Sequence, residues 1–142
     1  MWFPIAHNVL DYISNIYSAF ELIIDRDADY ENIDALSMAS DNVWCAGVIL
    51  GNPIENWKNI DFNTLKSTLY WNDETPQEAI IKDANPFDTL AWVINLRLSL
   101  NLNIPKGSKI ITGSVIKTRS PKKGDVITYN VGNLSETKIR LI

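Results

Sequence analysis

The chain has 142 residues, enough to bury a sizeable core, and we expect residues 1–142 to form a single domain. Its hydrophobic content of 46%, charged content of 21% and formal net charge of −4 are ordinary for a globular protein and offer no electrostatic footprint for nucleic acid. No apolar run approaches the roughly 18 residues of a membrane span. The single cysteine and the absence of a signal-peptide pattern favour a cytoplasmic location.

The first half of the chain predicts one helix followed by two strands. Apolar residues recur at a spacing of about 3.6 residues from Ile5 to Phe20, which predicts a helix with Pro4 in its first turn. Residues 20–24 are then expected to form a short buried strand. An acidic loop over 25–34 and a helical turn or loop over 35–42 follow. Residues 43–50 form a strongly apolar strand, which is expected to end at the turn signal of residues 51–53.

The second half predicts further strands and one long helix. One or two strands are expected within residues 57–71, followed by a hairpin turn over 71–74. Asn85 is a good helix N-cap with Pro86 in the first position, and the helix is expected to reach about residue 100. Residues 109–112 are expected to form a strand, and residues 126–131 and 138–142 a hairpin. These elements predict an α+β domain dominated by mixed or antiparallel sheet.

Glu21 is the most informative candidate for a functional residue. It stands between aliphatic residues in a predicted strand, where a carboxylate is costly to bury without a cation or several hydrogen-bond donors. The alternative is an edge strand with Glu21 facing water, and the residues alone leave both interpretations open.

Two other patterns have simpler explanations than chemistry. Asp25, Asp27 and Asp29 begin like a calcium loop, but Tyr30 stands where a glycine is required, so a solvated acidic loop is favoured. Cys45 has no predicted histidine partner, because the only histidine is His7 in the N-terminal segment, and an inert buried thiol is favoured.

Several short motifs occur in an order that resembles the C-terminal half of the 2-keto-4-pentenoate hydratase family, within the fumarylacetoacetate-hydrolase-like group of metal-dependent enzymes. The motifs are individually modest and gain specificity from their order. They are Phe20-Glu21, Asp41-Asn42, Asn85-Pro86, Leu90-Ala91-Trp92 with Asn95, Ile110-Ile111-Thr112-Gly113-Ser114 and Gly124-Asp125.

The resemblance implies a mainly antiparallel β-roll or sandwich with flanking helices. It implies that Glu21 is one of three carboxylates that hold Mg²⁺ or Mn²⁺, the other two belonging to an upstream Glu-x-Glu pair. No Glu-x-Glu pair occurs in these 142 residues, and the family's upstream lysine is also missing. The expected activity is hydration or decarboxylation of small 2-oxo or 2-hydroxydienoic acids.

The resemblance also assigns substrate contacts. Thr112 and Ser114 are expected to bind the substrate acid, since such a loop offers hydroxyls and backbone N–H groups. Asp41 and Asn42 match a family segment whose following serines lie near substrate. Those serines are replaced here by Trp44 and Cys45, which argues against an unaltered site.

Two functional hypotheses remain open, besides a less favoured unrelated β-rich binding domain. The chain is either a lyase whose missing N-terminal half comes from elsewhere, or a catalytically inactive remnant that binds a small acid or a protein partner. No individual catalytic residue is assigned, and a homo-oligomer is expected, because missing sequence would leave apolar surface exposed.

Overall fold

The computed structural model describes residues 9–142, so the start of the predicted N-terminal helix, with His7, lies outside the described residues. The rest of that helix prediction is wrong. A short 3₁₀ helix covers Val9–Tyr12, and strand β1 already begins at Tyr17 and runs over Tyr17–Ile23. Tyr17, Ala19 and Phe20 pair with a second strand, and Ser18 at the irregularity between them donates its backbone N–H to the Ser135 hydroxyl at 3.0 Å. These long-range contacts override the local helical spacing.

Strand β1 pairs antiparallel with β2 (Cys45–Pro53) in a two-stranded sheet. The two strands expected near residues 20–24 and 43–50 are therefore confirmed. Register shifts interrupt the pairing near both ends of β1. The turn expected at residues 51–53 is wrong, because β2 continues through them and Pro53 lies opposite Tyr17. Proline is tolerated here because β2 is an edge strand of a two-stranded sheet and the pairing is irregular beside Pro53.

A second, four-stranded antiparallel sheet has the order β4-β3-β5-β6. Its strands are β3 (Lys66–Trp71), β4 (Gln77–Ile80), β5 (Val126–Val131) and β6 (Ser135–Arg140). The turn predicted over residues 71–74 is confirmed, since Glu74 donates its backbone N–H to the Trp71 carbonyl at 3.1 Å and β3 and β4 are antiparallel neighbours. The predicted C-terminal hairpin is also confirmed, with β6 starting earlier than expected.

Buried hydroxyl groups join the two sheets. The Ser18 side chain of β1 lies 2.9 Å from the Ser135 hydroxyl and 2.6 Å from the Thr137 hydroxyl, both on β6. Ser135 also donates to the carbonyl of Asn52. Gly51 faces the same point, and a Cβ there would overlap the Ser18 and Thr137 oxygens and a β6 carbonyl. The strands therefore cross closely here because Gly51 has no side chain.

Two groups of apolar side chains form the core around this junction. One contains Ile54, Trp57 and Val131 beside the short 3₁₀ helix Trp57–Asn59. The other contains Leu69, Trp71 and Ile127 on one face of the four-stranded sheet. Leu69 and Trp71 alternate with exposed Tyr70, the period-two pattern of a strand with one buried face.

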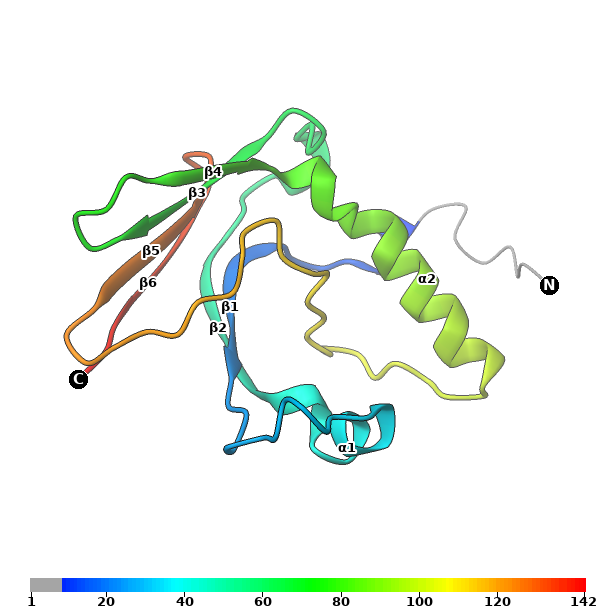
Figure 1. Cartoon of the computed structure of the whole chain (residues 1–142). Helices are drawn as coiled ribbons and strands as arrows, with labels where there is room; N and C mark the ends of the chain where they lie inside the picture. Colours follow the sequence, from blue (N-terminus) through cyan, green and yellow to red (C-terminus); the bar gives the residue numbers. More distant parts are fainter. Residues whose placement is uncertain (1–8) are drawn as a thin grey trace.

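The two α-helices lie outside the sheets. Helix α1 (Ala35–Ser40) and the 3₁₀ turn Asn42–Trp44 connect β1 to β2. Helix α2 (Pro86–Ser99) follows the 3₁₀ turn Ile81–Ala84 and confirms the helix predicted after Asn85. Asn85 does occupy the N-cap, but in a left-handed conformation and without a side-chain capping bond. Figure 1 shows α2 standing apart from β1 and β2, with the segment after it folded back between them.

Residues 103–121 form a long loop in which the strand expected at 109–112 is not present. Within residues 9–142, no helix is long and apolar enough to cross a membrane. The described chain is thus a mixed α+β fold with antiparallel sheets and few helices, in agreement with the expected fold class.

Candidate functional site

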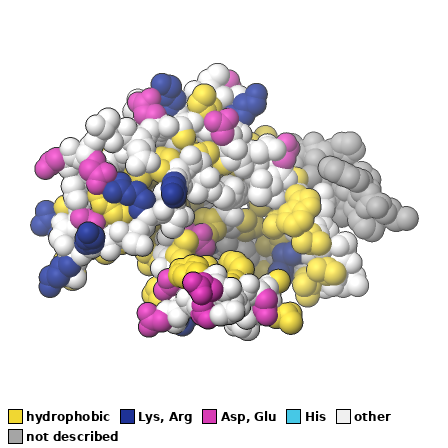
Figure 2. Space-filling view, in the orientation of Figure 1, with side chains coloured by type: hydrophobic (Ala, Val, Ile, Leu, Met, Phe, Trp, Pro, Cys, Tyr) yellow, Lys and Arg dark blue, Asp and Glu magenta, His cyan; other side chains and the backbone are white. Residues whose placement is uncertain are grey.

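A large open cavity of about 1330 Å³ lies between β1, the 103–121 loop and α2. Figure 2 shows a hollow on this face with hydrophobic side chains gathered around it. The wall is mainly apolar, with contributions from all three elements and from the four-stranded sheet. These side chains include Phe20, Leu22, Leu50, Leu69, Phe87, Leu90, Ile94 and Ile116. A concave apolar surface with a few polar groups is the usual form of a small-molecule site.

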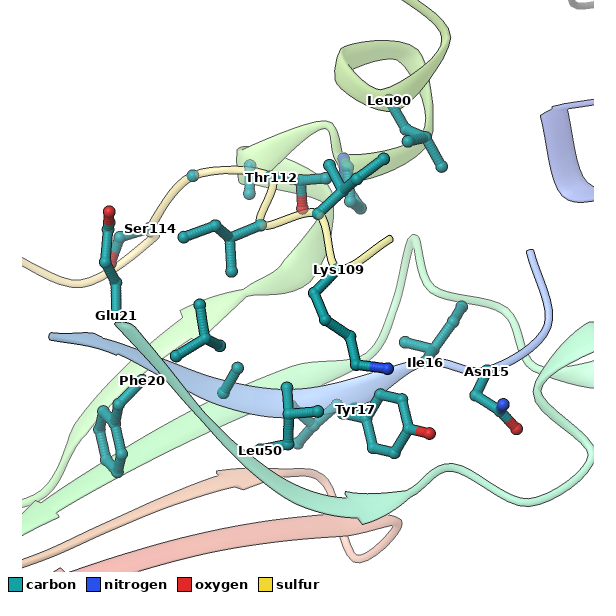
Figure 3. A pocket seen from close by; sticks show the side chains of 18 of the residues that line it. Asn15, Ile16, Tyr17, Phe20, Glu21, Leu50, Leu90, Lys109, Thr112 and Ser114 are labelled. Atoms are coloured by element: carbon teal, nitrogen blue, oxygen red, sulfur yellow. The ribbon is translucent and has the colours of Figure 1, made fainter. Parts of the chain in front are cut away.

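Glu21, Thr112 and Ser114 line this one cavity although they come from distant parts of the chain. Figure 3 shows Glu21 on β1 and Ser114 on the loop at the same end of the cavity, with Thr112 further along the loop. Glu21 is exposed, so the expectation of a buried carboxylate is wrong and the alternative of a solvent-facing side chain is correct. Glu21 forms no ion pair with any residue of the described chain.

The 112–116 segment forms a compact turn. Gly113 has a φ of +87°, a left-handed conformation that glycine adopts without strain. The Ser114 hydroxyl donates to the Ile116 carbonyl at 2.5 Å and accepts from the Ile116 N–H at 3.2 Å. A ligand acid at Ser114 therefore competes with this internal bond, whereas no hydrogen bond holds the half-buried Thr112 side chain in the described chain.

Asp41 and Asn42 lie away from the main cavity. Asp41 forms an ion pair with Arg26 and lines a separate cavity of about 230 Å³. Asn42 donates its side-chain N–H to the Cys45 carbonyl at 3.3 Å. Residues 42–44 all have φ between 50° and 62°, a strained conformation for Val43 in particular. The structure thus brings three of the five sequence-predicted site residues together and separates the other two.

The acidic loop after β1 makes local hydrogen bonds. Tyr30 donates to Asp25 at 2.5 Å, and Asp29 accepts from the Asn32 side chain at 2.7 Å. The Asn32 bond, followed by the Glu31 backbone N–H, lowers the pKa of Asp29. Across residues 9–142, no group of three or more histidine, cysteine or acidic side chains is placed to hold a metal ion. Glu21 alone does not satisfy a hard cation, which takes about six oxygen ligands.

A cluster around Arg119 closes the edge of the cavity. Arg119 forms two hydrogen bonds to the Glu74 carboxylate, at 2.8 and 2.9 Å, and its guanidinium lies 4.1 Å from the Trp71 ring centroid. The Arg119 bond lowers the pKa of Glu74. Trp71 in turn donates its Nε1–H to Asp125 at 3.1 Å. This cation is therefore already neutralised and positions the loop against the sheet.

Lys109 is the cavity residue that sequence reasoning missed. It lines the cavity, and Figure 3 shows its side chain extending from the loop toward β1. A signal was present in the sequence, because residues 89–124 contain no acidic residue. The same segment contains seven cations, namely Arg97, Lys106, Lys109, Lys117, Arg119, Lys122 and Lys123.

The chain is similar to known proteins in sequence and in structure. The chain is 26% identical over 141 residues to 4-oxalocrotonate decarboxylase of Pseudomonas putida and 28% identical over 148 residues to 2-oxo-hept-4-ene-1,7-dioate hydratase of Escherichia coli. These matches cover 92% and 96% of this chain. The chain spans about half the length of these curated relatives, 53% in both cases. No protein-family profile matches it.

The solved structures give the same result for the fold. A 4-oxalocrotonate decarboxylase from Pseudomonas putida G7, complexed with magnesium and adipate, superposes with a TM-score of 0.79 at 24% identity. The match covers 94% of this chain and 52% of the decarboxylase chain. A second structure of that decarboxylase, with calcium and acetate, gives a TM-score of 0.77.

The fold is therefore fumarylacetoacetate-hydrolase-like, as the order of motifs predicted. Within that class, the chain is similar over about half of their length to a 4-oxalocrotonate decarboxylase and a 2-oxo-hept-4-ene-1,7-dioate hydratase, in agreement with the resemblance that the motifs indicated.

Proposed function

We propose that the cavity is part of the active site of a lyase that hydrates or decarboxylates small 2-oxo acids. The observation that carries this proposal is the convergence of Glu21, Thr112 and Ser114 on one mainly apolar cavity. The names of the sequence relatives support this substrate class, since both are enzymes of 2-oxo or oxalo acids.

In this proposal the loop of residues 112–114 binds the acid group of the substrate. No hydrogen bond within residues 9–142 occupies the Thr112 hydroxyl, and a turn with a left-handed glycine such as Gly113 can present backbone N–H groups to a carboxylate. The apolar walls around α2 and β1 remove water from the carbon chain of the substrate and strengthen the polar contacts at its end.

The described residues contain no group of three or more histidine, cysteine or acidic side chains placed to hold a metal ion, whereas the two solved decarboxylase structures contain magnesium or calcium. We therefore assign no step to a cation within residues 9–142. Glu21 is proposed as a single ligand, with the remaining carboxylates supplied by another polypeptide segment. That segment is expected to carry the Glu-x-Glu pair and the lysine that the resemblance implies.

Reconstitution tests the lyase proposal. The chain is mixed with the part of Pseudomonas putida 4-oxalocrotonate decarboxylase that the alignment leaves uncovered, and Mg²⁺-dependent loss of 4-oxalocrotonate is followed. Turnover that requires both polypeptides and disappears with Glu21→Ala is the expected result. Since a foreign half need not assemble, the coding sequence upstream of Met1 is read as well. Absence of a Glu-x-Glu segment there, together with no reconstituted turnover, contradicts the proposal.

A second candidate function is acid binding without turnover. It is favoured by the position of Asp41 in an ion pair with Arg26, away from the main cavity, and by Trp44 and Cys45 in place of the family's serines. Trp44 packs edge-on against Tyr30 with ring centroids 5.6 Å apart, so this segment has a local packing role. Adipate binding that persists while reconstituted turnover stays absent identifies this second function.

A further inference from the structure

The charges on the cavity wall are unevenly distributed. The acidic residues that line it are Asp11 and Glu21, whereas its cations all come from the 103–121 loop. Those cations are Lys106, Lys109, Lys117 and Arg119. In a chain with a formal net charge of −4, this local excess of positive charge favours an anionic ligand.

Lys109 is the lining cation whose side chain is labelled in Figure 3. Its side chain extends from the loop toward β1, with the ammonium group at the end of the cavity where Asn15 and Tyr17 lie. Glu21 and Ser114 lie at the other end. Lys109 forms no ion pair with any residue in the described part of the chain, in contrast to Arg119, which is bound by Glu74.

The two ends of the cavity therefore have different chemistry. The end with Ser114 offers a neutral hydroxyl beside the Glu21 carboxylate, and Thr112 lies further along the loop toward Lys109. The end with Lys109 offers an ammonium group that has no ion pair within residues 9–142, beside the Tyr17 hydroxyl and the Asn15 amide. Apolar side chains, among them Leu50 and Leu90, line the space around them. A linear molecule with an acid at each end and an apolar middle matches this arrangement.

We propose that Lys109 binds the distal carboxylate of a dicarboxylic ligand and makes the site selective for diacids over monoacids. This inference rests on the proposed function, because the first acid group is placed at the loop of residues 112–114. Lys109 is a specificity-determining residue in this proposal and takes no part in bond making or breaking. The charged hydrogen bond to the distal carboxylate supplies the discrimination, since a monoacid of equal length leaves the ammonium group unpaired.

Calorimetry with adipate and hexanoate, two acids of equal chain length, tests the proposal on the intact chain. Wild type is expected to bind adipate about tenfold more tightly than hexanoate. Lys109→Met is expected to weaken adipate binding about tenfold and leave hexanoate unchanged. Lys109→Arg keeps the cation and is expected to retain most of the preference. Lys123→Met, an exposed change in the same cationic segment but outside the cavity, is the matched control with unchanged binding.

The outcomes separate this proposal from the proposed function. If the ratio of the affinities for adipate and hexanoate is the same in Lys109→Met as in wild type, the role of Lys109 is overturned. It is also overturned if wild type does not bind adipate measurably or shows no preference for it. The double variant Thr112→Ala, Ser114→Ala is expected to weaken both acids equally. If it affects neither acid while Lys109→Met still removes the preference, the acid placement in the proposed function fails and the Lys109 contact stands. Thermal unfolding of Lys109→Met confirms that the exposed substitution leaves the fold intact.

Discussion

The side-chain oxygens of Ser18 and Ser135 lie 2.9 Å apart in the buried junction where β1 and β2 cross the four-stranded sheet. Both residues are almost fully buried, with exposed fractions of 1% and 5%. The contact orients β1, and with it Glu21, relative to the sheet that forms one wall of the cavity. The junction requires a glycine on β2, so its tolerance to a single methyl group tests the architecture.

Gly51→Ala is expected to destabilise the fold by about 3 kcal/mol, the upper part of the usual range for overpacking. The added Cβ overlaps backbone and hydroxyl oxygens of β6 and β1, which have little room to move. Gly47→Ala on the same strand is the control, because its Cβ meets only Leu22 at an ordinary 3.9 Å. Urea unfolding of both variants measures the difference. Equal losses for the two substitutions would show that the strands do not cross as described.

The intact chain is expected to bind Mg²⁺ and Mn²⁺ with dissociation constants above about 1 mM. The reason is that Glu21 and Asp11 are the only acidic residues that line the cavity within residues 9–142, and no cluster of ligands exists there. Calorimetry of each cation, without a partner polypeptide, provides the measurement. No Mg²⁺-dependent hydration or decarboxylation is expected under the same conditions. Micromolar binding that Glu21→Ala abolishes would contradict the single-ligand description.

Glu21→Gln is expected to strengthen adipate binding by the metal-free chain about twofold to fivefold. The Glu21 carboxylate lies at the cavity end where the ligand acid is proposed to bind, and like charges repel even in a well-solvated site. Glu136→Gln on β6, outside the cavity, is the matched control. Weaker binding in Glu21→Gln would place the ligand acid elsewhere. In a reconstituted lyase the sign reverses, and the same variant is expected to lose turnover.

Lowering the pH is expected to destabilise the contact between the β3–β4 hairpin and β5, because this contact depends on the Asp125 carboxylate. Its carboxylate accepts from the Lys122 backbone N–H at 2.9 Å and from the Asn72 side chain at 2.8 Å. These bonds, the Lys122 bond first, lower its pKa below the ordinary 3.8. A depressed folded pKa contributes stability above the unfolded pKa, and that contribution is lost as pH falls through the folded value.

Thermal midpoints measured from about pH 6 to about pH 2.5 test this, a range that spans the ordinary carboxyl pKa. Wild type is expected to lose stability below the ordinary pKa more steeply than Asp125→Asn, which has no charge to lose. Asp73→Asn in the neighbouring turn is the control. If the thermal midpoints of wild type and Asp125→Asn fall in parallel as the pH is lowered, Asp125 does not contribute to the pH dependence of stability.

Local sequence patterns predicted those helices and strands whose local preference is the same as the structure that they adopt in the folded chain. The Asn85-Pro86 start defined α2, and alternation defined β5 and its hairpin partner. The prediction failed where long-range pairing decides the structure. Residues 17–20 have helical spacing but pair with β2, and residues 51–53 look like a turn but lie in a strand that needs a glycine at its crossing.

The candidate site was predictable only in part. The resemblance led to Glu21, Thr112 and Ser114, which line one cavity, although whether they bind substrate stays a prediction. It also led to Asp41, which lies in an ion pair elsewhere. Lys109 carries no motif, and only the absence of acidic residues over 89–124 indicated it. Its position depends on how an irregular loop folds over β1, which no short sequence pattern encodes.

Helix α2 has no fully buried residue, and its Trp92 side chain is 61% exposed. The four-stranded sheet, in contrast, holds its own compact core of Leu69, Trp71 and Ile127. The amide protons of α2 should therefore exchange with deuterium through local opening, long before those of β3 and β5. A polypeptide that covers the helix would slow this exchange selectively, so mass spectrometry of α2 peptides would report assembly even in the absence of any reaction.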